Sequence, residues 1–146
     1  MKYYQIVKIN KTTFEEVVKA FSDINFIKFL TFIQPIKIIE WSGIKNKKIA
    51  FFKLWFLGWK NFKVIHSDYR LNKKQLSFID QGVELPLGIT DWNHKHIVRN
   101  NKTNILIIDS INIKHKNILT GYILFPILIF PIFIRKLLYK LYFKNK

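Results

Sequence analysis

The chain has 146 residues and no cysteine, and its 25 Lys and Arg against 9 Asp and Glu give a formal net charge of +16. This length suits one domain, residues 1–146, and the missing thiols exclude disulfide frameworks and thiolate zinc sites. Only three of the basic residues are Arg, the preferred side chain for reading phosphate and guanine. We therefore interpret the charge as solvated lysine faces and predict no specific nucleic-acid partner.

The first residues favour a cytoplasmic location. The segment MKYYQIVKINKTTFEE alternates in polarity and carries charges where a signal peptide needs an unbroken apolar stretch. The absence of cysteine agrees with a reducing compartment. We expect a cytoplasmic protein, and the lysine excess leaves association with an anionic membrane surface open.

The N-terminal part of the chain predicts strands at both ends of a helical region. Thr13 stands three residues ahead of Glu16, which is the spacing of a capping box at the start of a helix. Pro35 ends the apolar stretch that follows this helix. The predicted elements are a strand over 3–10, a helix over 11–23, helical or irregular structure over 24–35 and a strand over 36–43.

Residues 44–115 predict a meander of antiparallel strands. Aromatic and β-branched residues dominate, and short turn segments such as LGW, LNKK and NNKT separate the apolar runs. The predicted strands cover residues 47–58, 59–71, 74–83, 89–99 and 103–114.

The last part of the chain changes to helical periodicity. Lys136, Lys140 and Lys144 recur every four residues, while apolar residues from Ile134 onward occupy positions i, i+3, i+4 and i+7. This pattern predicts an amphipathic C-terminal helix, whose apolar face must be covered by the rest of the domain.

This order of elements resembles the helix-grip fold of the SRPBCC superfamily, which includes START domains, pollen-allergen-type proteins and polyketide cyclases. The segment FIDQGVELPLGITDWNHKH is similar to the bacterial SRPBCC pattern that ends in W-x-H-x-H. The matching residues are Phe78, Asp80, Gln81, Pro86, Trp92, His94 and His96, with Asp109 in the next strand and Arg135 in the last helix. The sequence departs from the pattern in its very apolar link before the last helix.

The resemblance implies an α+β domain in which a curved antiparallel sheet of about six or seven strands wraps a long C-terminal helix, with two short helices after the first strand. It also implies a cavity between sheet and helix that carries or senses a hydrophobic small molecule or lipid. A polyketide cyclase-like or aromatase-like enzyme with a His/Asp pair, and a membrane-associated lipid-binding protein, remain the alternatives. No cofactor is implied.

The NNKT loop indicates which residues face one another in the last hairpin. A two-residue turn there would place His94 directly opposite Asp109 and His96 opposite Ile107. Alternate residues of a strand share a face, so Trp92 lies on the same side as both histidines. We predict a hydrogen bond between His94 and Asp109 on the concave face of the sheet, under the C-terminal helix.

The role of this pair stays open between three readings. The two side chains satisfy one another in the core, or they and His96 give polar contacts to a ligand, or His94, Asp109 and His66 are catalytic and move protons. The His-x-His spacing also matches a zinc site, but the sequence gives no position for a third ligand such as His66, Glu84 or Asp109. We therefore predict no metal.

Aromatic residues make up 16% of the chain and are the candidates for contact with an apolar ligand. Several lie on predicted strands, where a curved sheet can present them to a cavity. The predicted ligand-binding residues are Trp41, Trp55, Phe78, Trp92, His94, His96 and Asp109.

The segment 118–134 has 17 residues without a charge, which is the lower limit for a membrane span. It contains Pro126 and Pro131, and positive charges flank both of its ends. Three alternatives follow: a broken helix packed on the sheet, the same helix with peripheral membrane contact through residues 118–144, or a true span. We favour the packed helix, because a span would remove the cover of the cavity.

Overall fold

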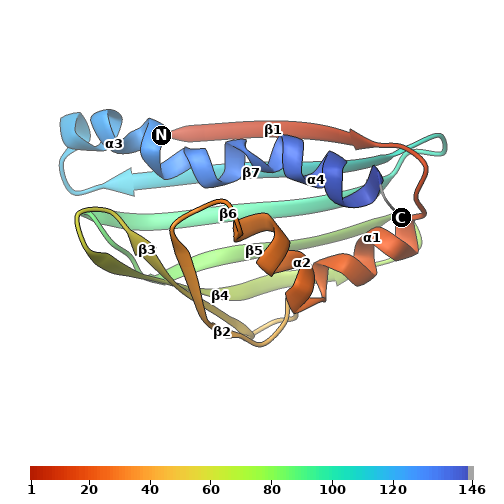
Figure 1. Cartoon of the computed structure of the whole chain (residues 1–146), viewed down its shortest axis with the longest axis horizontal. Coiled ribbons are helices and arrows are strands. Elements are labelled where there is room, and N and C mark those ends of the chain that lie inside the picture. Colours follow the sequence, from red (N-terminus) through yellow and green to blue (C-terminus); the bar gives the residue numbers. More distant parts are fainter. Residues whose placement is uncertain (145–146) are drawn as a thin grey trace.

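The computed structural model describes residues 1–144 and has the predicted helix-grip architecture (Figure 1). The first strand is followed by two short helices, six further strands and a long C-terminal helical stretch. The elements are β1 (Lys2–Ile9), α1 (Phe14–Phe21), α2 (Ile24–Thr31), β2 (Ile36–Trp41), β3 (Ile49–Trp55), β4 (Trp59–Leu71), β5 (Gln75–Glu84), β6 (Ile89–Asn100), β7 (Ile105–His115), α3 (Ile118–Phe133) and α4 (Arg135–Lys144).

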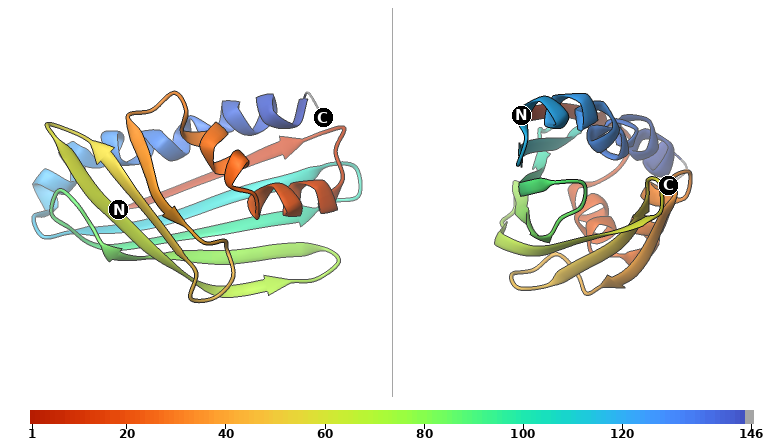
Figure 2. Two further views of the ribbon diagram at one scale, coloured as in Figure 1. Left: turned by 60° about the horizontal axis from the view of Figure 1, so that its bottom comes forward. Right: turned by 90° about the vertical axis from the view of Figure 1, so that its left-hand side faces the viewer.

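One antiparallel sheet of seven strands forms the body of the domain, in the order β1-β7-β6-β5-β4-β3-β2. The end-on view shows that the sheet curls into a half-barrel and that the helices lie across its open side (Figure 2). Strand β1 pairs with β7, so the first strand of the chain completes the edge of the sheet next to the C-terminal helices. The concave face of the sheet and the helices therefore enclose the interior between them.

Local sequence signals begin both short helices, and the first of these signals is the predicted capping box. The capping box is present: Thr13 accepts a hydrogen bond from the backbone of Glu16, and the Glu16 side chain accepts one from the backbone of Thr13. Asp23 caps α2 more simply, because its side chain accepts a hydrogen bond from the backbone N–H of Asn25. These caps satisfy N–H groups that a helix start leaves without partners.

The C-terminal helical stretch packs on the sheet as predicted, but its interruption is not at either of the two prolines. Pro126 and Pro131 lie within α3, and a turn at Ile134 separates α3 from α4. Close to the break, the carbonyl of Ile132 accepts a hydrogen bond of 3.0 Å from Nε2 of the buried Gln5. This bond ties the C-terminal helices to β1.

The register of the last hairpin differs from our prediction by two residues. The loop spans four residues, 101–104, because the Asn101 N–H donates to the Asn104 carbonyl and Asn100 pairs with Ile105. Asp109 consequently stands opposite His96, and the residue opposite His94 is Ile111. The prediction that His94 directly faces Asp109 was wrong, but a shift of two residues keeps every side chain on its predicted face.

The neighbouring leucines of α4 test how the helix packs. Leu138 is 1% exposed, whereas Leu137 is 53% exposed. We expect Leu138→Ala to lower the free energy of unfolding by about 2–5 kcal/mol, because it leaves a cavity in the core. The same change at Leu137 should stay within about 0.5 kcal/mol. Urea denaturation followed by circular dichroism measures both, and equal losses would contradict this packing.

Candidate functional site

Five titratable side chains meet on the concave face of four neighbouring strands. His66 comes from β4, Asp80 from β5, His94 and His96 from β6, and Asp109 from β7. Directly paired residues share a face, and the register pairs His66 with Asp80, Asp80 with His94, and His96 with Asp109. The sheet itself therefore assembles this group, which we call the His/Asp cluster.

Asp109 anchors one side of the cluster and is fully buried. Its Oδ1 lies 2.8 Å from Nε2 of His94 and 3.2 Å from Nδ1 of His96. Its Oδ2 accepts hydrogen bonds from Gln5 at 2.8 Å and from the hydroxyl of Tyr139 at 3.4 Å. The predicted hydrogen bond between His94 and Asp109 is confirmed, and it runs diagonally between the strands instead of straight across.

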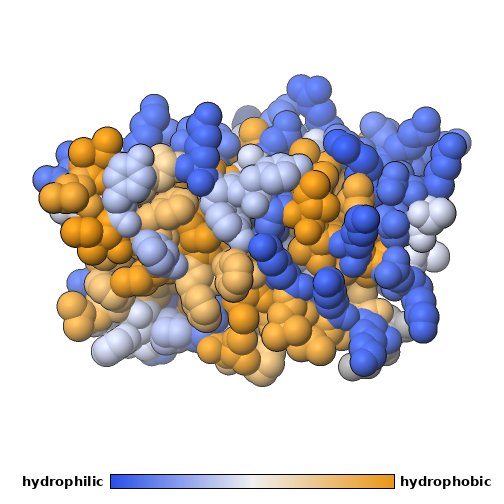
Figure 3. Space-filling view, turned by 90° about the horizontal axis from the view of Figure 1, so that it is seen from above, coloured by the Kyte–Doolittle hydropathy of each residue, from blue (hydrophilic) through white to orange (hydrophobic). Residues whose placement is uncertain are grey.

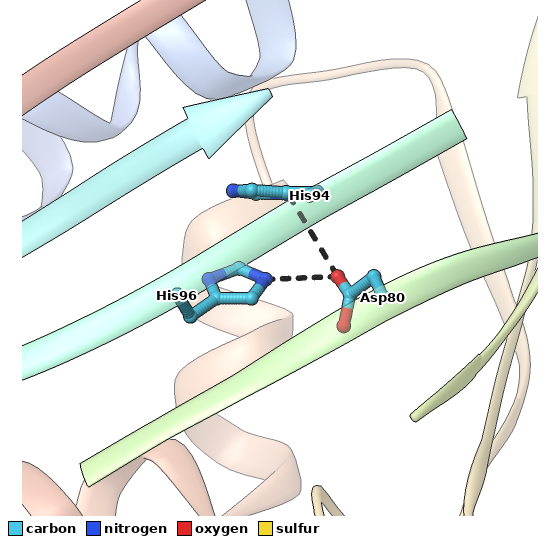
Figure 4. A group of neighbouring side chains, drawn as sticks. All are labelled: Asp80, His94 and His96. Atoms are coloured by element: carbon cyan, nitrogen blue, oxygen red, sulfur yellow. Dashed lines mark hydrogen bonds and ion pairs between the residues drawn. The ribbon is translucent and has the colours of Figure 1, made fainter. Parts of the chain in front are cut away.

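Asp80 lies on the other side of the same histidines. Its Oδ2 is 2.8 Å from Nε2 of His96 and 3.8 Å from Nδ1 of His94 (Figure 4). Its Oδ1 is 3.0 Å from Nε2 of His66. His96 thus bridges two carboxylates with its two ring nitrogens, an arrangement that favours the doubly protonated imidazolium.

The charges of the cluster follow from these contacts. Burial alone would lower the pKa of His96, but the charge of Asp80 and the contacts with Asp109 raise that pKa to about 9. Burial and the positive charge of His96 lower the pKa of His94 to about 4. Burial would raise the pKa of both carboxyl groups, but the histidine contacts outweigh it and hold each well below its usual value. At neutral pH, two carboxylates therefore surround one imidazolium and one neutral imidazole.

The neutral His94 has a defined tautomer. Its Nε2 carries the proton that it donates to Asp109, so Nδ1 keeps a free lone pair. A base catalyst needs such a lone pair, but Nδ1 points toward Asp80. The pair therefore orients His94 within the cluster, and proton transfer to a ligand would require the ligand to enter between His94 and Asp80.

A cavity of about 260 Å³ lies beside the cluster, between the sheet, α2 and α3. Most of its wall is apolar. The predicted ligand-binding residues that line it are Trp41, Trp55, Phe78, Trp92, His94 and His96. His66 and Asp80, which were not in that predicted set, also line it. Asp109 does not line the cavity, because it lies behind the histidines at 0% exposure. It acts on any ligand only through His94 and His96.

Four buried polar atoms of the cavity wall have neither a hydrogen bond nor an ion pair within the described part of the chain. They are Oε1 of Gln34, Nδ1 of His66, Nε1 of Trp92 and Nε of Arg135. An unpaired buried donor or acceptor costs about 1–3 kcal/mol, so such atoms indicate a place for a polar group or water. A ligand that presents an acceptor to Trp92 and Arg135 would satisfy two of them.

Sequence reasoning missed the central role of Asp80 and the supporting roles of Gln5 and Tyr139. Asp80 was noted only as part of a resemblance. The alternation of Phe78 and Asp80 in β5 puts both on one face, but only the pairing of β5 with β6 shows that this face carries the histidines. Gln5 and Tyr139 lie about a hundred and about thirty residues from Asp109 along the chain, and no local pattern connects them.

Asp109 should be the costliest polar residue of the cluster to replace. Asp109→Asn removes the negative charge that compensates the buried His96, and we expect a loss of about 3–5 kcal/mol in the free energy of unfolding. Asp91→Asn on β6 is a matched control, because Asp91 is partly exposed and its ion pair with Lys114 is long, at 3.9 Å. The control should lose less than about 1 kcal/mol. Urea denaturation at neutral pH measures both, and a similar stability for the two variants would contradict a compensated buried charge.

Comparison with known proteins places the fold. Neither a protein-family model nor a curated protein sequence matches this chain. Among solved structures, norcoclaurine synthase from Thalictrum flavum superposes with a TM-score of 0.63 at 18% identity, covering 100% of this chain and 88% of that one. A hypothetical protein from Helicobacter pylori gives a TM-score of 0.58 at 13% identity, with 84% and 79% covered. Ara h 8.0201 gives 0.55 at 10%, with 100% and 99% covered. These similarities support the helix-grip fold of the chain.

Proposed function

We propose that this protein binds a hydrophobic small molecule in the cavity between the sheet and the C-terminal helices, and carries or senses it. The observation that carries this proposal is an apolar cavity whose wall also holds unpaired buried polar atoms. Small-molecule sites combine apolar walls with a few directional polar groups in the same way. Norcoclaurine synthase, which shares this fold, is described in complex with dopamine and hydroxybenzaldehyde, and that supports a small aromatic ligand.

The size and polarity of the cavity narrow the ligand class. Its volume of about 260 Å³ is just below the range of about 300–1,000 Å³ that is usual for sites of drug-sized ligands. This favours an aromatic metabolite or a single acyl chain over a two-chain lipid. The guanidinium of Arg135 and the indole N–H of Trp92 favour a ligand with a carboxylate or another oxygen acceptor.

The cyclase-like alternative has weaker support from the geometry. His94 is the neutral imidazole that would serve as a base, and its free nitrogen lies 3.8 Å from Asp80 instead of facing the apolar part of the cavity. Catalysis by His94 would require the ligand to enter between His94 and Asp80, whereas binding in the apolar cavity does not.

A cavity-filling variant tests the binding site. Ala50 is buried on β3 and lines the cavity, so Ala50→Trp should weaken the binding of a fluorescent naphthalene sulfonate probe at least tenfold. Lys53 lies on the opposite face of the same strand, and Lys53→Trp is the matched control. Competition by aromatic carboxylates and single-chain fatty acids then ranks ligand classes. Unchanged probe binding by Ala50→Trp would show that the probe binds outside the cavity and would contradict the proposed binding site.

We further propose that the open end of the cavity docks on an anionic membrane surface. Four residues both line the cavity and are about half exposed, so they mark its opening: Ile33, Trp55, Ile127 and Phe130. Leu57 in the nearby β3–β4 turn and Ile123 on α3 are still more exposed, at 82% and 67%. Seen from above, apolar side chains gather at the end of the molecule where α3 lies (Figure 3).

Lysines lie close to these apolar residues. Lys60 lines the cavity, the ammonium of Lys37 is 4.1 Å from the ring of Trp59, and that of Lys136 is 4.9 Å from the ring of Phe133. Exposed aromatic and aliphatic side chains beside lysines suit insertion at the interface with head-group contact. The stretch Ile118–Lys144 is also long and apolar enough to cross a membrane. We favour surface contact, because α3 contributes the buried Leu128, Ile129 and Ile132 to the core.

Vesicle binding distinguishes these arrangements. Ile123→Gln should lower cosedimentation with phosphatidylserine-containing vesicles about tenfold, since a large apolar side chain contributes about 1.5–3 kcal/mol when buried. Leu71→Gln is the control, because Leu71 is 49% exposed at the far end of β4 from Trp59. Surface contact predicts release from native membranes by alkaline carbonate. Resistance to carbonate would indicate a span, and equal binding by both variants would contradict docking through α3.

A further inference from the structure

We infer that Asp80, His94 and His96 form a binding site for one divalent transition-metal ion. One ligand atom from each lies within 4.8 Å of the other two, and Asp80 Oδ2 is 2.8 Å from His96 Nε2 and 3.8 Å from His94 Nδ1. Ligands bound to a tetrahedral zinc ion at about 2.0–2.2 Å lie about 3.3–3.6 Å apart. To share one ion, Asp80 and His96 would move apart slightly and Asp80 and His94 would move closer, and Figure 4 shows the Asp80 carboxylate facing both histidines.

The outer nitrogens of both histidines support this reading. Each histidine turns its other ring nitrogen toward Oδ1 of Asp109, at 2.8 Å for His94 and 3.2 Å for His96. Metal-binding histidines commonly donate their second N–H to a carboxylate, which fixes the tautomer and the ring orientation. Asp109 is itself held by Gln5 and Tyr139, so the supporting shell is complete on the side away from the cavity.

The chemistry of the ligand atoms fits a metal ion. His94 Nδ1 already has a free lone pair, because its proton is on Nε2. The proton that His96 Nε2 shares with Asp80 occupies the place of the ion and would be released on binding. His66 holds the second oxygen of Asp80 at 3.0 Å and so orients the carboxylate.

The donor set indicates the class of metal. Two imidazoles and one carboxylate suit zinc, iron, cobalt or nickel, whereas calcium and magnesium prefer sites built from oxygen ligands. All three ligands line the cavity, so the remaining coordination position would face the bound small molecule or water. The sequence-based prediction of no metal lacked the third ligand, because Asp80 was not among the candidates considered.

Metal titration of the full-length protein without a histidine tag tests this site. After removal of metal by a chelator, the wild type should bind one Co²⁺ or Zn²⁺ per chain in calorimetry, and the Co²⁺ form should show visible d–d absorption. Asp80→Asn should weaken binding at least a hundredfold. Asp109→Asn should weaken it about 10–100-fold, as expected for a residue that orients the ligands. Two controls, Asp91→Asn and a substitution of His115, the histidine outside the cluster, should bind as the wild type does.

X-ray absorption of the Co²⁺-loaded wild type keeps the proposal testable if Asp80→Asn fails to fold. Its spectrum should show two imidazole ligands. Fewer than one ion per chain at micromolar concentrations, a spectrum without two imidazoles, or undiminished binding in a folded Asp80→Asn variant would each overturn the proposal.

Discussion

Asp109 brings a negative charge to the centre of the domain, where it has no exposure to solvent. A carboxylate in that position is tolerated only when several donors surround it. The structure supplies hydrogen bonds from Gln5, His94 and Tyr139 and an ion pair with His96. These groups come from three separate parts of the chain: β1, β6 and α4. Strand β1, strand β6 and helix α4 therefore all contact the two carboxylate oxygens of Asp109, and their relative positions depend on these contacts.

The cluster around Asp109 also divides the interior into two apolar parts. The larger core cluster, with Phe21, Phe26 and Tyr139, packs under α1, α2 and α4, while the smaller one, with Trp92 and Ile129, packs under α3. His96 stacks on Phe78 of the first at 4.5 Å between ring centroids, and His94 meets Trp92 of the second edge-on at 6.3 Å. The His/Asp cluster lies at the boundary between these two apolar parts and provides polar side chains to the wall of a mostly apolar cavity.

Much of this architecture could be predicted because it depends on local patterns. The capping box of Thr13 and Glu16, the strand alternation of Trp92, His94 and His96, and the helical period after Ile134 each lie within a few residues. The hairpin register could not be predicted, since a two-residue and a four-residue turn in NNKT preserve the same alternation. Asp80 was missed for a related reason: its position opposite His94 depends on the pairing of β5 with β6, which no single segment encodes.

The pairing of β1 with β7 has a consequence for how the chain reaches this structure. The partner of β1 is β7, which is the last strand in the sequence and lies about a hundred residues further along the chain. During synthesis, β1 has no place to pair until nearly the whole sheet has left the ribosome, so Gln5 reaches Asp109 and the Ile132 carbonyl only at the end. Contacts of such long separation slow folding. Until β1 pairs with it, the edge of β7 exposes unpaired backbone groups, which are open to pairing with other chains.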